Sequence, residues 1–189
     1  SVGFVKQNLI QFDSILPTLV PRCGQSVLIT IDGPAGSGKT TLANSLGAKL
    51  ASSYTVHMDD LYEGWQSTLT PELTIKLNSL LARIRDKSQV AFRPYDWQKN
   101  ELSEPINIPA PQYLILEGVG SGQGAIRKFA SLALWIEVPE SQGLARVILR
   151  DGPQVADQMV GFLAVQSAYF LKEDPKKSAD YRLSGLETV

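Results

Sequence analysis

The sequence predicts one three-layer α/β domain with a mostly parallel, five-stranded sheet. Short apolar runs of strand length alternate along the chain with segments whose apolar residues recur at helical spacing. Most of the short runs are apolar throughout, which is typical of parallel strands covered by helices on both faces. With 189 residues, of which 43% are hydrophobic, the chain is long enough for a single domain over residues 1–189 with a full core.

The N-terminal half is expected to hold three helices and two buried strands. Apolar residues at steps of three and four predict a helix within residues 1–24. The runs "SVLITI" (26–31) and "YTVHM" (54–58) predict strands, and leucines four residues apart predict a helix over 39–50 between them. Pro71 is a favourable first position for the next helix.

The C-terminal half repeats this alternation after a polar, proline-broken stretch that predicts a surface loop or hairpin over 93–111. The other elements expected there are a short strand over 89–92, buried strands over 113–118 and 132–138, a short helix near 122–130, a helix after Pro139, a helix over roughly 154–171 and an edge strand over 181–185.

Composition excludes several classes of function. The formal net charge of −1 gives no reason to expect a nucleic acid or an anionic membrane as a partner. No apolar run reaches the roughly 20 residues of a membrane span. The single cysteine, Cys23, cannot form an internal disulfide and fits a reducing compartment, so a cytoplasmic location is expected. A homodimer is possible.

The stretch "IDGPAGSGKTT" (31–41) lies between the first buried strand and a helix and has the spacing of a P-loop. Its glycines let backbone N–H groups turn inward around phosphates at the positive end of a helix. Lys39 is expected to reach the terminal phosphates of ATP, and Thr40 to ligate Mg²⁺. The fold is therefore expected to be that of a P-loop NTPase. The expected nucleotide-binding residues are Gly33, Pro34, Ala35, Gly36, Ser37, Gly38, Lys39, Thr40 and Thr41.

The ends of the other strands separate the classes of P-loop protein. No Asn-Lys-x-Asp guanine reader occurs, and the strand over 113–118 ends in Glu117 and a glycine, not in the Asp or Asp-Glu of a motor ATPase. Asp59 and Asp60 follow the strand over 54–58, at the sheet edge where ligands bind. These features favour a kinase.

"GPAGSGKTT", "MDDLY", "YDW" and "LILEG", in this order, resemble the uridine kinase-like P-loop kinases, a group that also includes phosphoribulokinase and bacterial pantothenate kinase. "DDLYEGW" and "RPYDW" are most similar to short members of the actinobacterial type. The resemblance spans roughly residues 25–186. It implies Mg²⁺- and ATP-dependent phosphoryl transfer to a hydroxyl group of a small molecule, under a short lid that lies with its following helix over 144–172.

The resemblance also implies roles for the acidic residues. Asp59 would be the base that takes the acceptor's proton, close to Mg²⁺, and Asp60 would lie near the acceptor. Glu117 would bind Mg²⁺ directly or through water. The residues alone leave two alternatives open, in which the aspartates cap a helix or turn and Glu117 is an ordinary strand-end residue.

Aromatic and polar residues gather in the two segments that the family uses for its acceptor. Aromatic rings supply stacking area, while arginine and aspartate would fix hydroxyls or an anionic group. Each of them could equally be an ordinary core or surface residue. His57 is expected to pack or hydrogen-bond inside its strand. The expected acceptor-binding residues are Asp60, Tyr62, Trp65, Arg93, Tyr95, Asp96 and Trp97.

"LARVILRDG" (144–152) resembles the arginine-bearing lid helix of the family. Arg146 and Arg150 share a helix face and would neutralise phosphate charge, unless they are surface ion pairs. Uridine kinases carry a second arginine group and a histidine after the Tyr-Asp segment, whereas here no arginine occurs between Arg150 and Arg182. The acceptor is therefore nucleoside-like or another metabolite, and an ATP-binding regulatory protein or weak ATPase is the alternative function.

Overall fold

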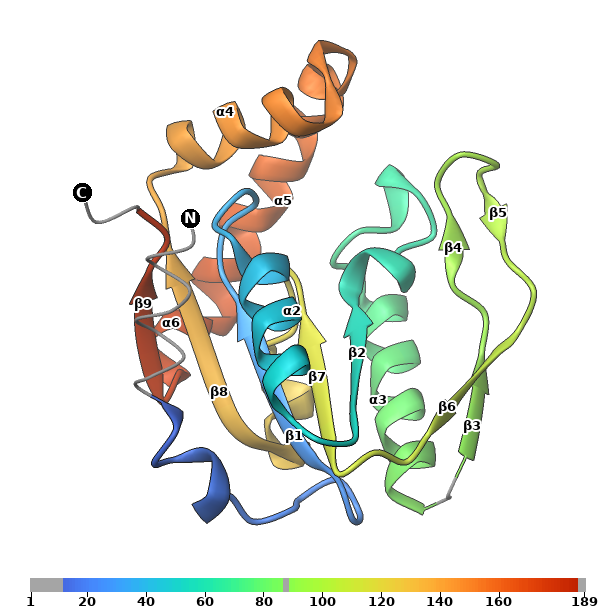
Figure 1. Cartoon of the computed structure of the whole chain (residues 1–189). Helices are drawn as coiled ribbons and strands as arrows, with labels where there is room; N and C mark the ends of the chain where they lie inside the picture. The colour runs from blue at the N-terminus through green and yellow to red at the C-terminus, as the bar shows by residue number, and fades with distance from the viewer. Residues whose placement is uncertain (1–11, 87–88, 187–189) are drawn as a thin grey trace.

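A computed structural model describes residues 12–86 and 89–186 and confirms the α/β fold (Figure 1). Its five-stranded sheet is wholly parallel. The carboxyl ends of the strands therefore share one edge, where ligands bind in such folds. The strands lie in the order β2 (Ser53–His57), β7 (Tyr113–Glu117), β1 (Val27–Asp32), β8 (Ala130–Glu137) and β9 (Tyr181–Ser184).

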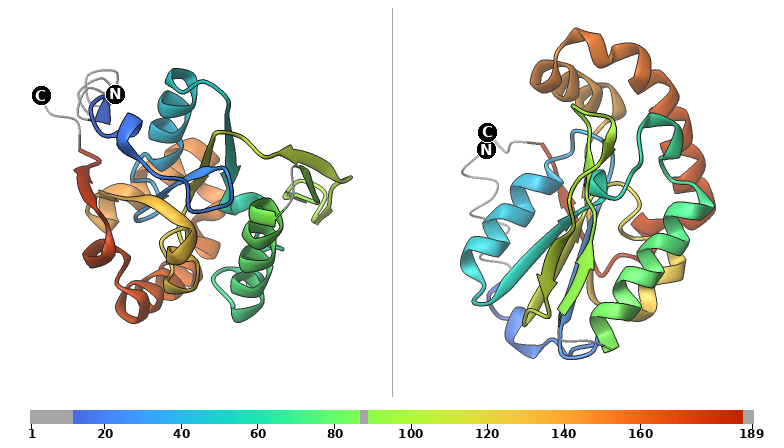
Figure 2. Two further views of the ribbon diagram at one scale, coloured as in Figure 1. Left: turned by 90° about the horizontal axis from the view of Figure 1, so that it is seen from below. Right: turned by 90° about the vertical axis from the view of Figure 1, so that its right-hand side faces the viewer.

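Helices cover both faces of the sheet and give the predicted three layers, which the right-hand view of Figure 2 shows edge-on. Helix α2 (Lys39–Lys49) packs on one face with Phe12 and Leu16. Helices α3 (Pro71–Asp86) and α5 (Ala156–Glu173) cover the opposite face. Each face thus has its own apolar core.

Part of the predicted N-terminal helix, residues 1–11, lies outside the described residues. The part that is described continues into the short 3-10 helix η1 (Leu16–Thr18) before the chain enters the sheet. Phe12 is fully buried, and its ring meets that of Tyr181 edge-on at 5.6 Å. The N-terminal segment therefore packs against the edge of the sheet formed by β9.

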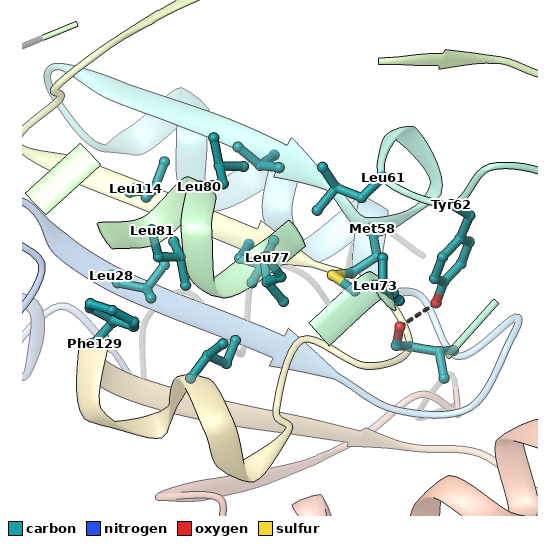
Figure 3. Close-up of a cluster of buried hydrophobic side chains, with 14 of the residues drawn as sticks. Leu28, Met58, Leu61, Tyr62, Leu73, Leu77, Leu80, Leu81, Leu114 and Phe129 are labelled. Atoms are coloured by element: carbon teal, nitrogen blue, oxygen red, sulfur yellow. Dashed lines mark hydrogen bonds between the residues drawn. The ribbon is translucent and has the colours of Figure 1, made fainter. Parts of the chain in front are cut away.

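Helix α3 begins where the sequence predicts it to begin. Pro71 is its first residue, and Thr70 Oγ1 accepts a hydrogen bond from Leu73 N at 3.3 Å, which satisfies an end group of the helix. Its apolar face packs on the sheet around Met58 and Leu114 (Figure 3). The buried residues of the helix are Leu73, Leu77, Leu80, Leu81 and Ile84.

The sequence analysis predicted a surface loop or a hairpin over 93–111, and the structure has hairpin pairing there. Strand β3 (Gln89–Phe92) pairs antiparallel with β6 (Ile106–Pro109), and β4 (Tyr95–Asp96) pairs with β5 (Glu101–Leu102). These ribbons stand beside α3, outside the main sheet, and reach up to the ligand edge (Figure 1).

The remaining elements connect the strands at both ends of the sheet. Helix α4 and the turn after it lie above the carboxyl ends of the strands in Figure 1. No helix in the described ranges has the length and apolar character that a membrane crossing requires. These connecting elements are η2 (Met58–Asp60), η3 (Trp65–Ser67), η4 (Gly124–Phe129), α4 (Glu140–Asp151), η5 (Pro153–Val155) and α6 (Pro175–Ser178).

Truncation of Leu77 is expected to test the core beneath α3. Leu77 is fully buried, so Leu77→Ala removes apolar contacts and leaves a cavity, which costs about 2–5 kcal/mol of unfolding free energy. Ile75, on the same helix, is 70% exposed, and Ile75→Ala should change stability by less than about 0.5 kcal/mol. Urea unfolding of both variants measures the difference. Equal effects would contradict the assigned packing of α3.

Cys23 is expected to be unreactive while the protein is folded. It is buried, and burial raises the pKa of its thiol to about 11. At pH 8 only about one thiol in a thousand is then the nucleophilic thiolate. Ellman's reagent should therefore label Cys23 rapidly only after denaturation in guanidinium chloride. Stoichiometric labelling of the native protein within seconds would contradict this packing.

Candidate active site

The P-loop joins β1 to α2, and its curl uses three glycines with positive φ, two of which lie next to helices. Gly36 has φ of +75°, and a Cβ there would lie 2.1 Å from Gly143 O in α4. Gly38, with φ of +99°, is the residue before the first turn of α2. The loop therefore ends at a helix N-terminus, whose partial positive charge favours an anion.

Lys39 lies at the base of this loop. Its side chain is buried, and its ammonium donates a hydrogen bond to Pro34 O at 2.7 Å. Burial lowers the pKa of Lys39 because desolvation penalises the charged form. The carboxylates of Asp32, Glu117 and Asp59 oppose this shift. Lys39 thus lies among three carboxylates that favour its charged form.

Glu117, the last residue of β7, is buried beside the P-loop and brings two side chains together. Thr40 Oγ1 donates a hydrogen bond to Glu117 Oε1 at 3.0 Å. His57 is the cross-strand partner of Glu117, and its Nδ1 lies 2.5 Å from the same oxygen. This hydrogen bond is the main cause of a raised pKa of His57. His57 therefore hydrogen-bonds at the end of its strand, as the sequence analysis expected.

The oxygen atoms of Thr40, Glu117 and Asp59 suit Mg²⁺. This ion is usually held by one or two protein carboxylates together with substrate phosphates, and it prefers oxygen ligands. All three side chains line one cavity. Among residues 12–86 and 89–186, no group of three or more His, Cys, Asp or Glu side chains could hold a metal ion by itself. The donor set therefore fits an ion that arrives with phosphates.

Asp59 and Asp60 form the turn η2 directly after β2. Asp59 lines the cavity and its side chain stays open to solvent. The pKa of Asp59 is nevertheless raised, first because the surrounding protein displaces water and second because Glu117 repels its charge. Asp60 is half-buried, and its pKa is also raised, chiefly by desolvation.

One cavity of about 460 Å³ extends from the P-loop to a set of apolar side chains, a size within the usual range for small-molecule sites. We call this set the aromatic wall, and it consists of Tyr62, Trp65, Trp97, Met159 and Phe162. P-loop residues and carboxylates line the cavity together with aromatic rings from the segment after η2, from η3, from the β4–β5 ribbon and from α5. The predicted site residues that line it are Ala35, Gly36, Lys39, Thr40, Asp59, Tyr62, Trp65, Trp97, Glu117 and Arg150.

Four predicted acceptor residues do not line this cavity: Asp60, Arg93, Tyr95 and Asp96. Arg93 is exposed, and its guanidinium donates to backbone carbonyls of the ribbon, with Nε 2.9 Å from the Ser103 oxygen. Asp96 Oδ1 accepts hydrogen bonds from two backbone N–H groups of the following turn. The Tyr95 ring packs edge-on against Trp97 at 5.3 Å. Arg93, Tyr95 and Asp96 thus make their contacts within the ribbon.

The two predicted lid arginines lie on α4 but have different neighbours. Arg150 lines the cavity, and its Nε and Nη2 each donate to the Asp151 carboxylate at 2.6 Å. Arg146 Nη1 donates to Gly36 O at 3.2 Å and to Gly185 O at 2.8 Å. Arg146 therefore ties the P-loop to the C-terminal segment.

Sequence reasoning missed a buried support behind the P-loop. Asp32 Oδ1 accepts a hydrogen bond from Gly33 N at 2.7 Å, and Asp32 Oδ2 accepts one from Tyr169 OH at 2.7 Å. Tyr169 lies on α5, and from the same helix Gln166 Oε1 accepts a hydrogen bond from Ala35 N at 2.9 Å. Burial raises the pKa of Asp32. Two features of the sequence could have revealed this support: a charged residue at the end of an apolar strand and a glutamine on the apolar face of a helix.

Comparison with known proteins gives one consistent group. No protein family model matches the chain. A curated uridine kinase from Ureaplasma parvum serovar 3 is 30% identical over 142 residues, covering 66% of this chain and 69% of the relative. A uridine kinase from Clostridium novyi is 27% identical over 177 residues, covering 82% and 85%.

The similar solved structures have the same fold. A possible uridine kinase from Bacillus stearothermophilus superposes with a TM-score of 0.64 at 22% identity, covering 94% of this chain and 98% of the other. A putative fructose transport system kinase from Silicibacter superposes with a TM-score of 0.62 at 19% identity, covering 90% and 93%. At these identities the likeness concerns the fold alone.

Proposed function

The chain belongs to the uridine kinase-like family of P-loop kinases, and from this premise we propose that it transfers the γ-phosphoryl group of ATP to a hydroxyl group of a small molecule. The observation that carries the proposal is the shared cavity. Lys39 and Thr40 of the P-loop and the carboxylate of Asp59 all line it, and it continues past them to the aromatic wall. One space thus offers a place for both a phosphate donor and an acceptor.

In the proposed reaction, the acceptor oxygen bonds to the γ-phosphorus while the bond from that phosphorus to the β–γ bridging oxygen breaks. The products are a phosphate ester and ADP. Asp59 takes the proton of the acceptor hydroxyl, and its raised pKa brings it nearer to the working pH of a general base. Lys39 and the N-terminus of α2 stabilise the negative charge of the phosphates.

We propose that Mg²⁺ is held by Thr40 and Glu117, with Asp59 nearby. When bound, the ion would neutralise phosphate charge. His57 and Thr40 already fix Glu117 through hydrogen bonds to Oε1, so the carboxylate is oriented before any ligand binds. Such partners of a metal-binding carboxylate commonly tune its affinity for the ion.

One observation favours a second candidate function, an ATP-binding regulatory protein or weak ATPase. Both lid arginines are engaged within the protein, Arg146 with backbone carbonyls and Arg150 with Asp151. Asp151 offsets the charge of Arg150, and the bonds of Arg146 hold its guanidinium at Gly36 and Gly185, so neither arginine would reach a phosphate without breaking these bonds. Under this alternative, ATP binds but no acceptor is phosphorylated.

An ADP-release screen separates the two functions. The protein is incubated with Mg²⁺, ATP and single members of a panel of nucleosides, vitamins and sugar derivatives. A kinase releases ADP only with particular acceptors, whereas a weak ATPase releases it equally in every well. Tight ATP binding without turnover in any well would favour the regulatory protein.

A further inference from the structure

Aromatic side chains that contact one another line part of the cavity, and they bear on which acceptor the proposed kinase would take. The Trp65 ring meets Trp97 at 5.3 Å and Phe162 at 6.3 Å, both edge-on. The Tyr62 ring lies 6.5 Å from that of Phe162 in a tilted arrangement. These three ring contacts hold the aromatic wall together.

The polar atoms around the aromatic wall are already hydrogen-bonded to the backbone. Tyr62 OH donates to the Val119 carbonyl, the bond drawn as a dashed line in Figure 3. Trp97 Nε1 donates to Asp59 O at 2.9 Å, and Thr68 Oγ1 donates to Trp65 O at 3.2 Å. A polar ligand that enters here would have to compete with these bonds, and a buried group left unpaired costs about 1–3 kcal/mol.

The cationic side chains that could bind an anionic acceptor already have other partners. Arg150 is bound by Asp151 through two hydrogen bonds, and Lys39 belongs to the P-loop. Arg93, which the sequence analysis predicted to bind the acceptor, lies in the ribbon and does not line the cavity. Among the described residues that line the cavity, Lys39 and Arg150 are the only cations. A carboxylate or phosphate on the acceptor would therefore face Asp59 and Asp151 without a partner.

We propose that the acceptor carries its hydroxyl group on a neutral aromatic or apolar body. The aromatic wall would bind that body by stacking and apolar contact, and place the hydroxyl beside Asp59. Sugars, nucleosides and anionic alcohols would be disfavoured because their polar groups lose water and gain few partners. This proposal rests on the proposed function and names its substrate class.

Binding of simple probes tests the aromatic wall without requiring turnover. Benzyl alcohol, uridine and ribose are titrated separately into the full chain, and saturation-transfer NMR gives their dissociation constants. Benzyl alcohol should bind at least tenfold more tightly than uridine or ribose. Uridine or ribose binding as tightly as benzyl alcohol would overturn the proposal.

Two phenylalanines on α5 supply matched variants. Phe162 belongs to the aromatic wall, whereas Phe170 contacts Trp135 at 4.9 Å and does not line the cavity. Phe162→Ala should weaken benzyl alcohol at least tenfold, and Phe170→Ala should leave it within twofold. Phe162→Leu keeps apolar volume if the alanine variant does not fold, and should also weaken binding. Unchanged binding in the folded Phe162 variants would overturn the proposal.

The outcomes also separate this inference from the proposed function. If the enzyme phosphorylates a sugar or nucleoside efficiently, the aromatic wall does not select the acceptor, but the kinase assignment stands. If neutral aromatic alcohols bind at Phe162 and no alcohol of any class is phosphorylated, the kinase assignment fails while the binding site stands.

Discussion

Replacing Asp59 by asparagine is expected to lower kcat for the acceptor by about 10²- to 10⁴-fold, the usual contribution of a general base. Asparagine keeps the shape of the side chain but cannot accept the proton of the acceptor hydroxyl. The side chain lines the cavity between the P-loop and the aromatic wall, where the acceptor hydroxyl would meet the γ-phosphorus. ATP binding, measured by calorimetry, should remain within a few-fold of the wild type.

Asp60→Asn is the matched control for this experiment. Asp60 is the next residue in the same turn, but it does not line the cavity. Its substitution should leave kcat within about threefold if only the positioned carboxylate acts as the base. Phosphorylation of the acceptor by the Asp59 variant at the wild-type rate would show that the base is wrongly assigned.

Replacing Lys39 by methionine is expected to reduce kcat/KM for ATP by about 10²- to 10³-fold, which is the effect of losing one donor that stabilises charge. Methionine fills similar apolar volume but leaves Asp32, Asp59 and Glu117 without their central cation. These three carboxylates would then repel the incoming phosphates. Unlike the Asp59 variant, this one should lose ATP binding itself.

The control for Lys39→Met is a measurement on the same protein. Thermal unfolding must show that the variant is folded before its ATP affinity is compared by calorimetry. Arg22→Met serves as a matched charge removal, because Arg22 donates to the Ala130 carbonyl and does not line the cavity. Wild-type ATP affinity in the folded Lys39 variant would contradict the assigned phosphate site.

The fold and the position of the P-loop could be predicted because local chemistry specifies both. Continuous apolar runs predicted the buried parallel strands, and Pro71 predicted the start of α3. The spacing of Gly38, Lys39 and Thr40 predicted a loop at a helix N-terminus. Each of these signals lies within a few residues of the feature that it specifies.

The support of the P-loop and the shape of the acceptor side depend on long-range contacts. Gln166 reaches Ala35 across 131 residues of sequence, and only the packing of α5 on the sheet brings them together. Arg93 looked like an acceptor ligand by its neighbours, but pairing of the ribbon engages its guanidinium at Leu102 and Ser103. Spacing along the chain carries no information about either contact.

The most direct test of the central claim is the phosphorus balance of a complete reaction. Wild-type protein, Mg²⁺, ATP and an acceptor that gives ADP release are followed by phosphorus NMR. We predict one new phosphate ester for each ADP formed, no more free phosphate than in the control without acceptor, and ester formation at least about 10²-fold slower with Asp59→Asn. Formation of ADP with an equal amount of free phosphate, and no ester, would contradict it.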